Sequence, residues 1–468
     1  MPFVFHTYAP IVPQILAQFF VSITFIYLLW EYRRDGLALV LIFLCYERVF
    51  LFFGSAMTDL YKVTALLFVG YVFTQQKAWH FYFKKDRWII IIFIVFSIQF
   101  MVATFIFSKT SLTTIFSQYA RYLEVIMLWF LIKDATYTRE NPREILLLFY
   151  KIILMAMCIS IIQWLMLGSH IEGLVAGFTI NGGSHGTTIP ILGFIILWIL
   201  RGGKFNKYDW LYVAGLLLIG FTAAKRAVMF ILPIVIGVFM IYVARRRVNR
   251  TFVLGILAVP IVFYIGVRLT PTLNPDNKVW GRFDMEHIWD YAEHYQFGQD
   301  GVEGQMAIIQ SDDTKYFNTI TKDKKIEAEG RGGATIALLK LIFGSYSMTD
   351  QDLYGIGYNN MYGVDYAEFD KLPLTIHLNH KGSASGMFQS YVTVGVLGVF
   401  IAVLFLFVFL FYCKFKRLRI VLFLIVFWEY FFYTGLIIRT PAFMAMIFAA
   451  IHYTNFLYYK QKQQKRYL

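Results

Sequence analysis

Charged residues are scarce in this chain, and their scarcity excludes most soluble classes of protein. Only 15% of the 468 residues are Asp, Glu, Lys or Arg, whereas 58% are hydrophobic. A soluble domain of average composition carries about 25% charged residues. The aromatic share is 19%, with 48 Phe and 31 Tyr, as expected of a chain that faces lipid and two membrane–water interfaces. The composition therefore predicts an integral membrane protein.

Cysteines and nucleotide-binding motifs are also lacking. The three cysteines, Cys45, Cys158 and Cys413, lie outside the long polar segment at 270–386, so neither a disulfide framework nor a zinc site is expected there. The chain holds no Walker phosphate loop and no internal repeat, and nothing in it suggests coupling to ATP. No basic leader with a cleavage site opens the sequence, so we expect 11–30 to be a retained span.

The net charge of +14 is unevenly distributed. Residues 271–386 carry 17 Asp and Glu against 10 Lys and Arg, a net charge of −7, so the rest of the chain carries +21. The basic residues lie in short connections between apolar runs. This is the charge bias that orients membrane proteins rather than the footprint of a nucleic-acid-binding surface, and we expect no nucleic-acid partner.

About 13 apolar runs approach the length of about 20 residues that crosses a bilayer. We predict spans at 11–30, 37–54, 58–74, 88–107, 112–132, 145–167, 188–200, 210–223, 227–243, 251–269, 387–412, 420–438 and 441–458. Basic residues recur in alternate connections, at 33–34, 77–87, 133–143, 201–207, 245–250, 414–419 and in the tail at 460–466. The positive-inside rule makes these connections cytoplasmic and places the N-terminus and residues 270–386 outside.

The predicted fold class is an all-α polytopic membrane protein with about 12–14 spans. It has a transmembrane bundle at 1–269, a large outer loop at 270–386, and C-terminal spans with a basic tail at 387–468. The loop is too long for a simple connection, and its aromatic content argues for a folded lid. Apolar residues at helical spacing predict helices at 285–295 and 333–343 within it.

Charged residues inside spans cost several kcal/mol unless they are paired or face water. Glu47 and Arg48 lie in the second span and Glu429 in the twelfth, where a structural ion pair and a functional role are both open. Arg121 and Glu124 stand three residues apart on one helix face, so they can pair. A cation facing the interior of the bundle would also suit an anionic headgroup.

Two arginines at the outer side have a sharper interpretation. Lys225 and Arg226 lie where positive charge is disfavoured, and Arg226 is expected to begin a helix, whose free N–H groups already favour anions. A guanidinium there would bind phosphate in a bidentate manner, although an arginine that snorkels to the interface is the simpler alternative. Arg331 lies among glycines that allow close backbone approach, and pairing with Glu327 or Glu329 is its alternative role.

Three blocks of sequence, in this order, resemble the superfamily of O-antigen polymerases and O-antigen ligases, which are bacterial envelope glycosyltransferases. The first block, 221–230, has small residues, then Arg226, then an apolar helix. The second runs from Arg331 through an amphipathic helix to the Gly-x-Gly at 355–357. The third, 379–398, is similar to the family's His-bearing segment and ends in Gly-x-x-Gly. A fourth stretch, 177–186, is similar to a short outer loop of the family, although less specifically.

The third block departs from the family pattern, because Ala384 stands where the family usually has His. His380 lies four residues earlier and His377 another three. If the helix begins by Asn379, His380 and Ala384 share one face and His380 reaches the same place. If this segment is a loop, the assignment of His380 fails.

The resemblance implies a GT-C-like fold in the bacterial inner membrane, with an active site that faces the periplasm. It implies a glycosyl transfer without metal or cofactor, from an undecaprenyl-pyrophosphate-linked oligosaccharide to a hydroxyl of an acceptor glycan. Membrane lipids are further partners, and binding of a polysaccharide chain-length regulator stays open. The enzyme has to stabilise negative charge on the leaving pyrophosphate, position two large substrates and accept a proton.

The residues expected to perform these tasks follow from both arguments. Arg226 and Arg331 would bind the pyrophosphate, and His380 would act as base or orient the acceptor, with His377 as its alternative. The expected substrate contacts are Lys225, Arg121 and Arg282, with Tyr354, Tyr358, Asn359 and Trp280 near sugars unless these aromatic residues only pack the loop.

Three functions are considered. A repeat-unit polymerase is favoured over a ligase that transfers glycan to a lipid A core or a protein acceptor. The third, a transporter or flippase, would favour repeated, broken spans with charges at the midplane, whereas the notable charges here cluster at the outer side.

Overall fold

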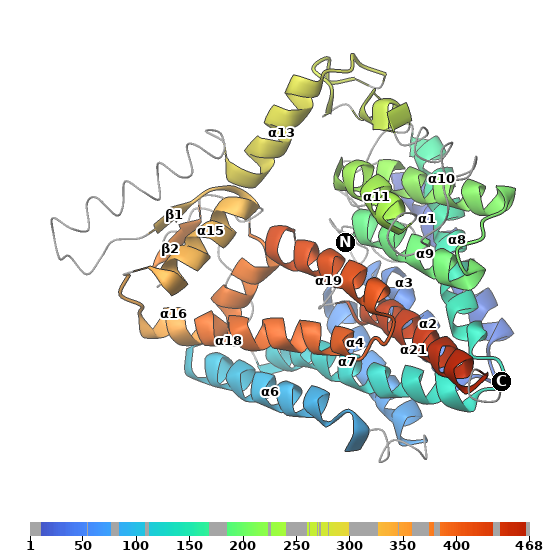
Figure 1. Ribbon diagram of the computed structural model, residues 1–468, viewed down its shortest axis with the longest axis horizontal. Coiled ribbons are helices and arrows are strands. Elements are labelled where there is room, and N and C mark those ends of the chain that lie inside the picture. Colours follow the sequence, from blue (N-terminus) through green and yellow to red (C-terminus); the bar gives the residue numbers. More distant parts are fainter. Residues whose placement is uncertain are drawn as a thin grey trace.

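The computed structural model describes residues 11–464 except 54, 76–83, 108–111, 168–184, 223–225, 240–259, 262, 269, 271–272, 279, 299–325, 345, 358–373, 379–383 and 434–439 (Figure 1). The N-terminal half forms α1 (Ile11–Glu31), α2 (Gly36–Cys45), α3 (Glu47–Leu51), α4 (Ser55–Thr74), α6 (Arg87–Phe107), α7 (Leu112–Thr138), α8 (Arg143–Leu167), α9 (His185–Arg201), α10 (Lys207–Thr222) and α11 (Arg226–Val238). The segment 270–386, which is predicted to lie outside and is named the outer segment from here on, forms α13 (Met285–Phe297), β1 (Ile326–Ala328), α15 (Gly330–Phe343), α16 (Asp350–Tyr354) and β2 (Ile376–Leu378). The chain ends with α18 (Gly386–Phe411), α19 (Lys416–Phe432) and α21 (Pro441–Gln464).

Helices coincide with every predicted span except 251–269, most of which lies outside the described residues. The second span is interrupted at Tyr46, where the backbone leaves the helical region between α2 and α3. These helices were predictable because a long run of apolar residues is a local property of the sequence.

Four described helices are long and apolar enough to cross a membrane: Gln14–Glu31, Arg87–Phe105, Arg143–Gln163 and Gly386–Phe411. Their outward faces expose large apolar side chains, including Ile98, Leu165 and Leu404, each of which is more than half exposed. Water does not tolerate continuous apolar surface of this kind, whereas hydrocarbon does. These features are those of a mostly helical, membrane-associated protein.

Aromatic side chains connect four helices in the centre of the bundle. The ring of Phe405 on α18 stacks on Phe96 of α6, with centroids 5.4 Å apart. One turn further on, Phe409 lies 4.7 Å from Phe448 of α21 and 5.2 Å from Trp129 of α7. In Figure 1, α6, α7 and α18 accordingly run side by side, with α21 lying along α7. The high Phe content thus serves packing inside the bundle as well as contact with lipid.

Both helices predicted within 270–386 are confirmed, as α13 and α15. The outer segment also contains a small parallel sheet in which Ile326 of β1 is the register partner of Ile376 of β2. Strands of three residues are too short to give a periodic signal, so the sheet was not predicted. In Figure 1 this group lies at one end of the bundle, with α13 leaning away from the helices.

A buried carboxylate ties the outer segment to α18. Asp352 of α16 accepts hydrogen bonds from the hydroxyls of Thr349 (2.8 Å), Thr375 (2.5 Å) and Tyr391, and from the backbone N–H of Thr375 (2.9 Å). A buried ionised carboxylate is tolerated when several donors replace the water that it loses. Asp352 thereby holds α16, the residue before β2 and the first turns of α18 in one arrangement.

The helix α18 is kinked at Gly395, which has a φ of 69° and a ψ of −177°. The kink withdraws carbonyl groups from the helical ladder, and the Gly-x-Gly segment binds them: Ile356 N donates to Val392 O (2.8 Å) and Gly357 N to Thr393 O (3.1 Å). The amide of Gln99 on α6 donates to Val394 O at 2.9 Å. The Gly-x-Gly at 355–357 and the first glycine of the Gly-x-x-Gly at 395–398 are therefore parts of one contact.

Candidate functional site

Arg331 lies at the start of α15, between two aromatic rings. Its guanidinium carbon is 4.8 Å from the ring centroid of Tyr295 on α13 and 4.8 Å from that of Tyr433, which follows α19. Rings on either side fix the plane of a guanidinium and contribute cation–π attraction, while its five N–H donors point outward in that plane. Arg331 is thus a half-buried, oriented cation.

The glycines around Arg331 make this arrangement possible. Gly330 has a φ of 64°, and a Cβ there would lie 2.2 Å from the carbonyl oxygen of Gln296. A Cβ on Gly332 would lie 2.7 Å from the ring of Phe297. The C-terminal turn of α13 therefore packs directly on the first turn of α15, and this contact brings Tyr295 to Arg331. The sequence predicted a close backbone approach at these glycines, and the segment that approaches them is the C-terminal turn of α13.

Tyr433 connects three elements at this place. Its hydroxyl lies 3.4 Å from Thr187 Oγ1 in the first turn of α9, and its carbonyl accepts a hydrogen bond of 2.9 Å from the N–H of Gly386, the first residue of α18. Its ring contacts Arg331 at the start of α15. The N-terminal ends of α9, α15 and α18 consequently gather around one tyrosine.

Buried hydroxyls reinforce this assembly. Thr335 Oγ1 donates to the carbonyl of Phe431 at 2.6 Å and lies 3.1 Å from Ser385 Oγ. Ser385 caps α18 by accepting from the N–H of Phe388 at 3.2 Å. Each N-terminal end contributes partly unpaired N–H groups and the positive end of a helix dipole. We name Arg331 and these helix starts the Arg331 site; a cation beside helix N-termini is a combination that favours an anion.

Arg226 is the first residue of α11, as predicted. The helices α9, α10 and α11 pack on one another, and α9 and α10 are joined by a short turn held by an ion pair of 2.8 Å between Arg201 and Asp209. An antiparallel course returns the chain to the end at which α9 begins, so α11 starts at the end that carries Thr187. The side chain of Arg226 and all of Lys225 lie outside the described residues.

The two candidate histidines, His377 and His380, precede α18, so neither belongs to the helix on which the assignment of His380 was based. The helix α18 begins at Gly386, after Ser385 in extended backbone, and Ala384 lies before the helix. A shared helix face with Ala384 therefore does not support His380. His380, Tyr358 and Asn359 lie outside the described residues. His377 lies in β2 opposite Glu327, on the face away from the buried Ile376 and Leu378. The roles of His380 and His377 stay predictions.

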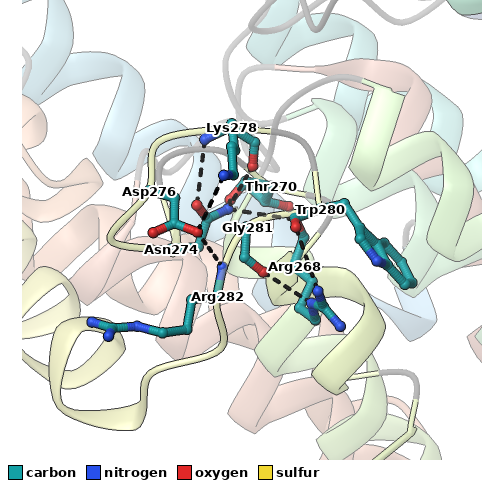
Figure 2. A network of polar contacts seen from close by, with 8 residues as sticks. All are labelled: Arg268, Thr270, Asn274, Asp276, Lys278, Trp280, Gly281 and Arg282. Atoms are coloured by element: carbon teal, nitrogen blue, oxygen red, sulfur yellow. Dashed lines mark hydrogen bonds and ion pairs between the residues drawn. The ribbon is translucent and has the colours of Figure 1, made fainter.

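The predicted sugar contacts Trp280 and Arg282 lie on a tight turn before α13, shown in Figure 2. Asn274 organises this turn by donating to the carbonyls of Thr270 and Lys278, both at 2.9 Å. The guanidinium of Arg268 lies 4.5 Å from the ring of Trp280, which is 51% exposed. Figure 2 shows the side chain of Arg282 pointing away from the network. Its guanidinium lies 3.5 Å from the carboxylate of Asp284. Exposure of Trp280 favours a surface contact over internal packing. Tyr354, at the end of α16, is also 36% exposed.

Arg121 lies in a buried ion-pair network. Its guanidinium contacts Glu47 at 2.7 Å and Glu124 at 3.2 Å, and it lies 5.3 Å from the ring of Tyr61. Two carboxylates balance this cation, which favours the structural interpretation. Glu47 contacts Arg121 on α7, while Arg48 donates to Gln163 on α8 at 3.4 Å. The role of Arg121 toward a headgroup stays a prediction.

Comparison with known proteins adds no relative, because the sequence matches no protein-family model and no curated protein. Among the residues that the structure describes, no group of three or more His, Cys, Asp or Glu is placed to hold a metal ion. Sequence reasoning missed Tyr295, Tyr433 and Thr187, which complete the Arg331 site. No local pattern marks these three residues, because they belong to separate segments that meet only in the fold. By contrast, the Thr349-x-x-Asp352 pattern of a capping box was a signal for Asp352.

Proposed function

We propose that this protein is a polysaccharide repeat-unit polymerase of the bacterial inner membrane, of the O-antigen or capsule kind. It would transfer an undecaprenyl-pyrophosphate-linked glycan to a hydroxyl of an acceptor glycan. The observation that carries the proposal is the Arg331 site, where an oriented guanidinium meets the N-terminal ends of three helices. An anionic leaving group at the membrane surface needs a site of this chemistry.

The arrangement supports stabilisation of a departing pyrophosphate. In the transition state the bond between the anomeric carbon and the pyrophosphate oxygen breaks, and negative charge builds on that oxygen. Preorganised donors aimed at this charge lower the barrier because they need no reorganisation during the reaction. Arg331 is preorganised by the rings of Tyr295 and Tyr433, and a planar guanidinium matches the spacing of phosphate oxygens.

The folded outer segment supports the positioning of two large substrates. The Gly-x-Gly segment at 355–357 is bonded to the kink of α18, and the same helix begins beside Tyr433. Two of the three blocks that resemble the polymerase and ligase superfamily are thus in direct contact. Such contact is expected of blocks that serve one site, and it strengthens the resemblance as an argument for function.

In this proposal Arg226 is a second pyrophosphate contact from the start of α11, and His380 or His377 accepts the proton of the attacking hydroxyl. The site faces the periplasm, where flipped lipid-linked glycans are available. The fold would then be GT-C-like. Arg282 and Trp280 on the turn before α13 would contact the glycan, since both are exposed.

The test supplies the purified full chain in lipid nanodiscs with lipid-linked repeat unit extracted from the cells of origin. A ladder of products supports a polymerase. Transfer that requires an added lipid A core acceptor identifies a ligase, and absence of transfer with either acceptor favours the transporter alternative.

Two variants locate the chemistry. Arg331→Lys keeps the charge but loses the planar fork, and we expect at least about a 100-fold loss of rate, because one preorganised donor contributes about that much. Arg34→Lys, an exposed arginine at the other end of the bundle, is the matched control and should keep its rate. Equal rates for the two variants would contradict the role of Arg331.

A further inference from the structure

A polar cavity lies at the other end of the bundle from the Arg331 site. It has a volume of about 690 Å³ and is formed where α6 begins and where α7, α18 and α21 end. The site at Arg331 adjoins the first residue of α18, whereas this cavity adjoins Tyr412, just after its last. We name it the α7–α21 cavity. Its ionisable lining among the described residues comprises Lys85, Asp86, Lys133, Lys414, His452 and Lys462.

The lining of the α7–α21 cavity is strongly basic. Its single carboxylate, Asp86, already accepts hydrogen bonds from Lys133 Nζ at 2.5 Å and from Trp129 Nε1 at 2.8 Å. Three further lysines, Lys85, Lys414 and Lys462, also line the cavity. Burial lowers the pKa of Lys133, and Lys85 and Lys414 lower it further against the opposing effect of Asp86, so these ammonium groups repel one another across the cavity.

A neighbouring cavity at the same end of α7 shows that a basic lining is not general there. It has a volume of about 670 Å³ and is lined by Arg34 and Arg139 together with Asp35, Glu140 and Glu144. Arg139 forms two hydrogen bonds of 2.6 Å with the carboxylate of Asp35. Its cations are balanced by carboxylates, whereas those of the α7–α21 cavity exceed its one carboxylate.

The wall of the α7–α21 cavity also contains a buried histidine whose ring nitrogens are only weakly paired. His452 is 1% exposed, and its ring lies 4.2 Å from that of Trp129. Apart from a weak contact with the backbone of Trp129, the ring nitrogens form no hydrogen bond of good geometry with a described protein atom. A buried imidazole that is only weakly paired costs free energy that a bound polar ligand would recover.

We propose that the α7–α21 cavity binds a phosphate-bearing anion. Lysines act as point-charge ligands for phosphate, and His452 supplies a donor from the cavity wall. The volume lies within the range of about 300–1,000 Å³ that is usual for small-ligand sites. The phosphate belongs either to the headgroup of an anionic lipid or to a soluble molecule. This site is independent of the proposed function, because it lies at the other end of α18.

The experiment measures binding to the purified full chain in non-ionic detergent without any glycan donor. Inorganic pyrophosphate is titrated calorimetrically at low salt as the soluble probe. In the second arm, native mass spectrometry compares retention of phosphatidylglycerol with that of phosphatidylcholine. Saturable binding of pyrophosphate that is unchanged in Arg331→Lys, and so does not come from the Arg331 site, identifies a soluble source. Preferential retention of phosphatidylglycerol without such pyrophosphate binding identifies a headgroup.

The matched variants exploit exposed lysines on the same elements. Lys414→Gln combined with Lys462→Gln removes two lining charges, and we expect affinity to fall at least about tenfold. Lys416→Gln combined with Lys460→Gln removes the same charge from exposed positions outside the lining and should bind as the wild type does. His452→Phe keeps a ring in the wall and should also weaken binding.

Three results would overturn the proposal: neither probe binds the wild type selectively, both double variants lose affinity equally, or the lining double variant binds as tightly as the wild type. Thermal unfolding without ligand, compared between the two double variants, verifies that each is folded.

Discussion

Replacing Gly395 by alanine tests how the outer segment is joined to the membrane helices. Gly395 has a φ of 69° and a ψ of −177°, a conformation that is essentially restricted to glycine. A Cβ there would lie 2.2 Å from the carbonyl oxygen of Leu353. The opposite partner is equally tight, since a Cβ on Gly355 would lie 2.6 Å from the backbone nitrogen of Gly395. Alanine has to separate the two backbones.

The magnitude follows from two costs. Holding a non-glycine residue in this backbone region costs about 1–3 kcal/mol. Separation also breaks the hydrogen bonds Ile356 N to Val392 O and Gly357 N to Thr393 O, each contributing about 0.5–1.5 kcal/mol. We therefore expect Gly395→Ala to destabilise the protein by about 2–6 kcal/mol.

The assay follows thermal unfolding in detergent with a thiol-reactive dye that reports exposure of the buried Cys45 and Cys413. Gly70→Ala is the control, because a Cβ there meets nothing within 4 Å and alanine favours the helix. Gly355 has a φ of 82°, so alanine there adds its own backbone cost of about 1–3 kcal/mol. The double variant should nevertheless lose less stability than the sum of the two single variants, since the shared contact is lost only once. Equal melting of Gly395→Ala and Gly70→Ala, or full additivity of the two glycine substitutions, would refute the reasoning.

Four further predictions concern single residues. Arg226→Ala should abolish glycan extension and leave membrane insertion intact, and wild-type chain lengths would exclude a phosphate contact. Of the two histidine variants, His380→Ala should be inactive in the transfer assay; an inactive His377→Ala beside a normal His380→Ala would move the proton acceptor to β2. Arg121→Met should destabilise the protein by about 3–5 kcal/mol, because it leaves two carboxylates unpaired, whereas lost turnover at unchanged melting temperature would indicate a headgroup contact. Burial raises the pKa of the Cys413 thiol to about 11, so it should resist maleimide at pH 7 and react as pH rises toward that value, with rapid labelling at pH 7 as the contrary result.

The sequence was informative wherever a local run of residues decides the outcome. The lengths of apolar runs predicted the helices of the bundle, because crossing hydrocarbon requires a continuous apolar segment. Spacing within a few turns predicted the start of α11 at Arg226 and helices at 285–295 and 333–343, which the structure extends to 285–297 and 330–343. Spacing also indicated that Arg121 and Glu124 can pair, although the contact with Glu47 joins residues 74 positions apart.

The sequence was silent wherever the outcome depends on segments that meet only after packing. The start of α18 at Gly386 is decided by the cap at Ser385 and by the bond from Gly386 N to Tyr433 O, so the register assumed for His380 could not be checked beforehand. The strands β1 and β2 exist because each buries two side chains against the same core. Each strand has only three residues, which is too few to produce a recognisable alternating pattern in the sequence.

By itself, the sequence determined the class of protein, the positions of its helices and the arginine at the centre of the candidate site. The tertiary structure alone decided that Arg331 lies between Tyr295 and Tyr433, that three helix ends gather there, and that four lysines share one cavity at the opposite end. The physical reason is the distance along the chain over which each kind of interaction acts. Hydrophobic length and helix capping act over one or a few turns of chain, whereas these contacts arise when distant segments pack on a common core.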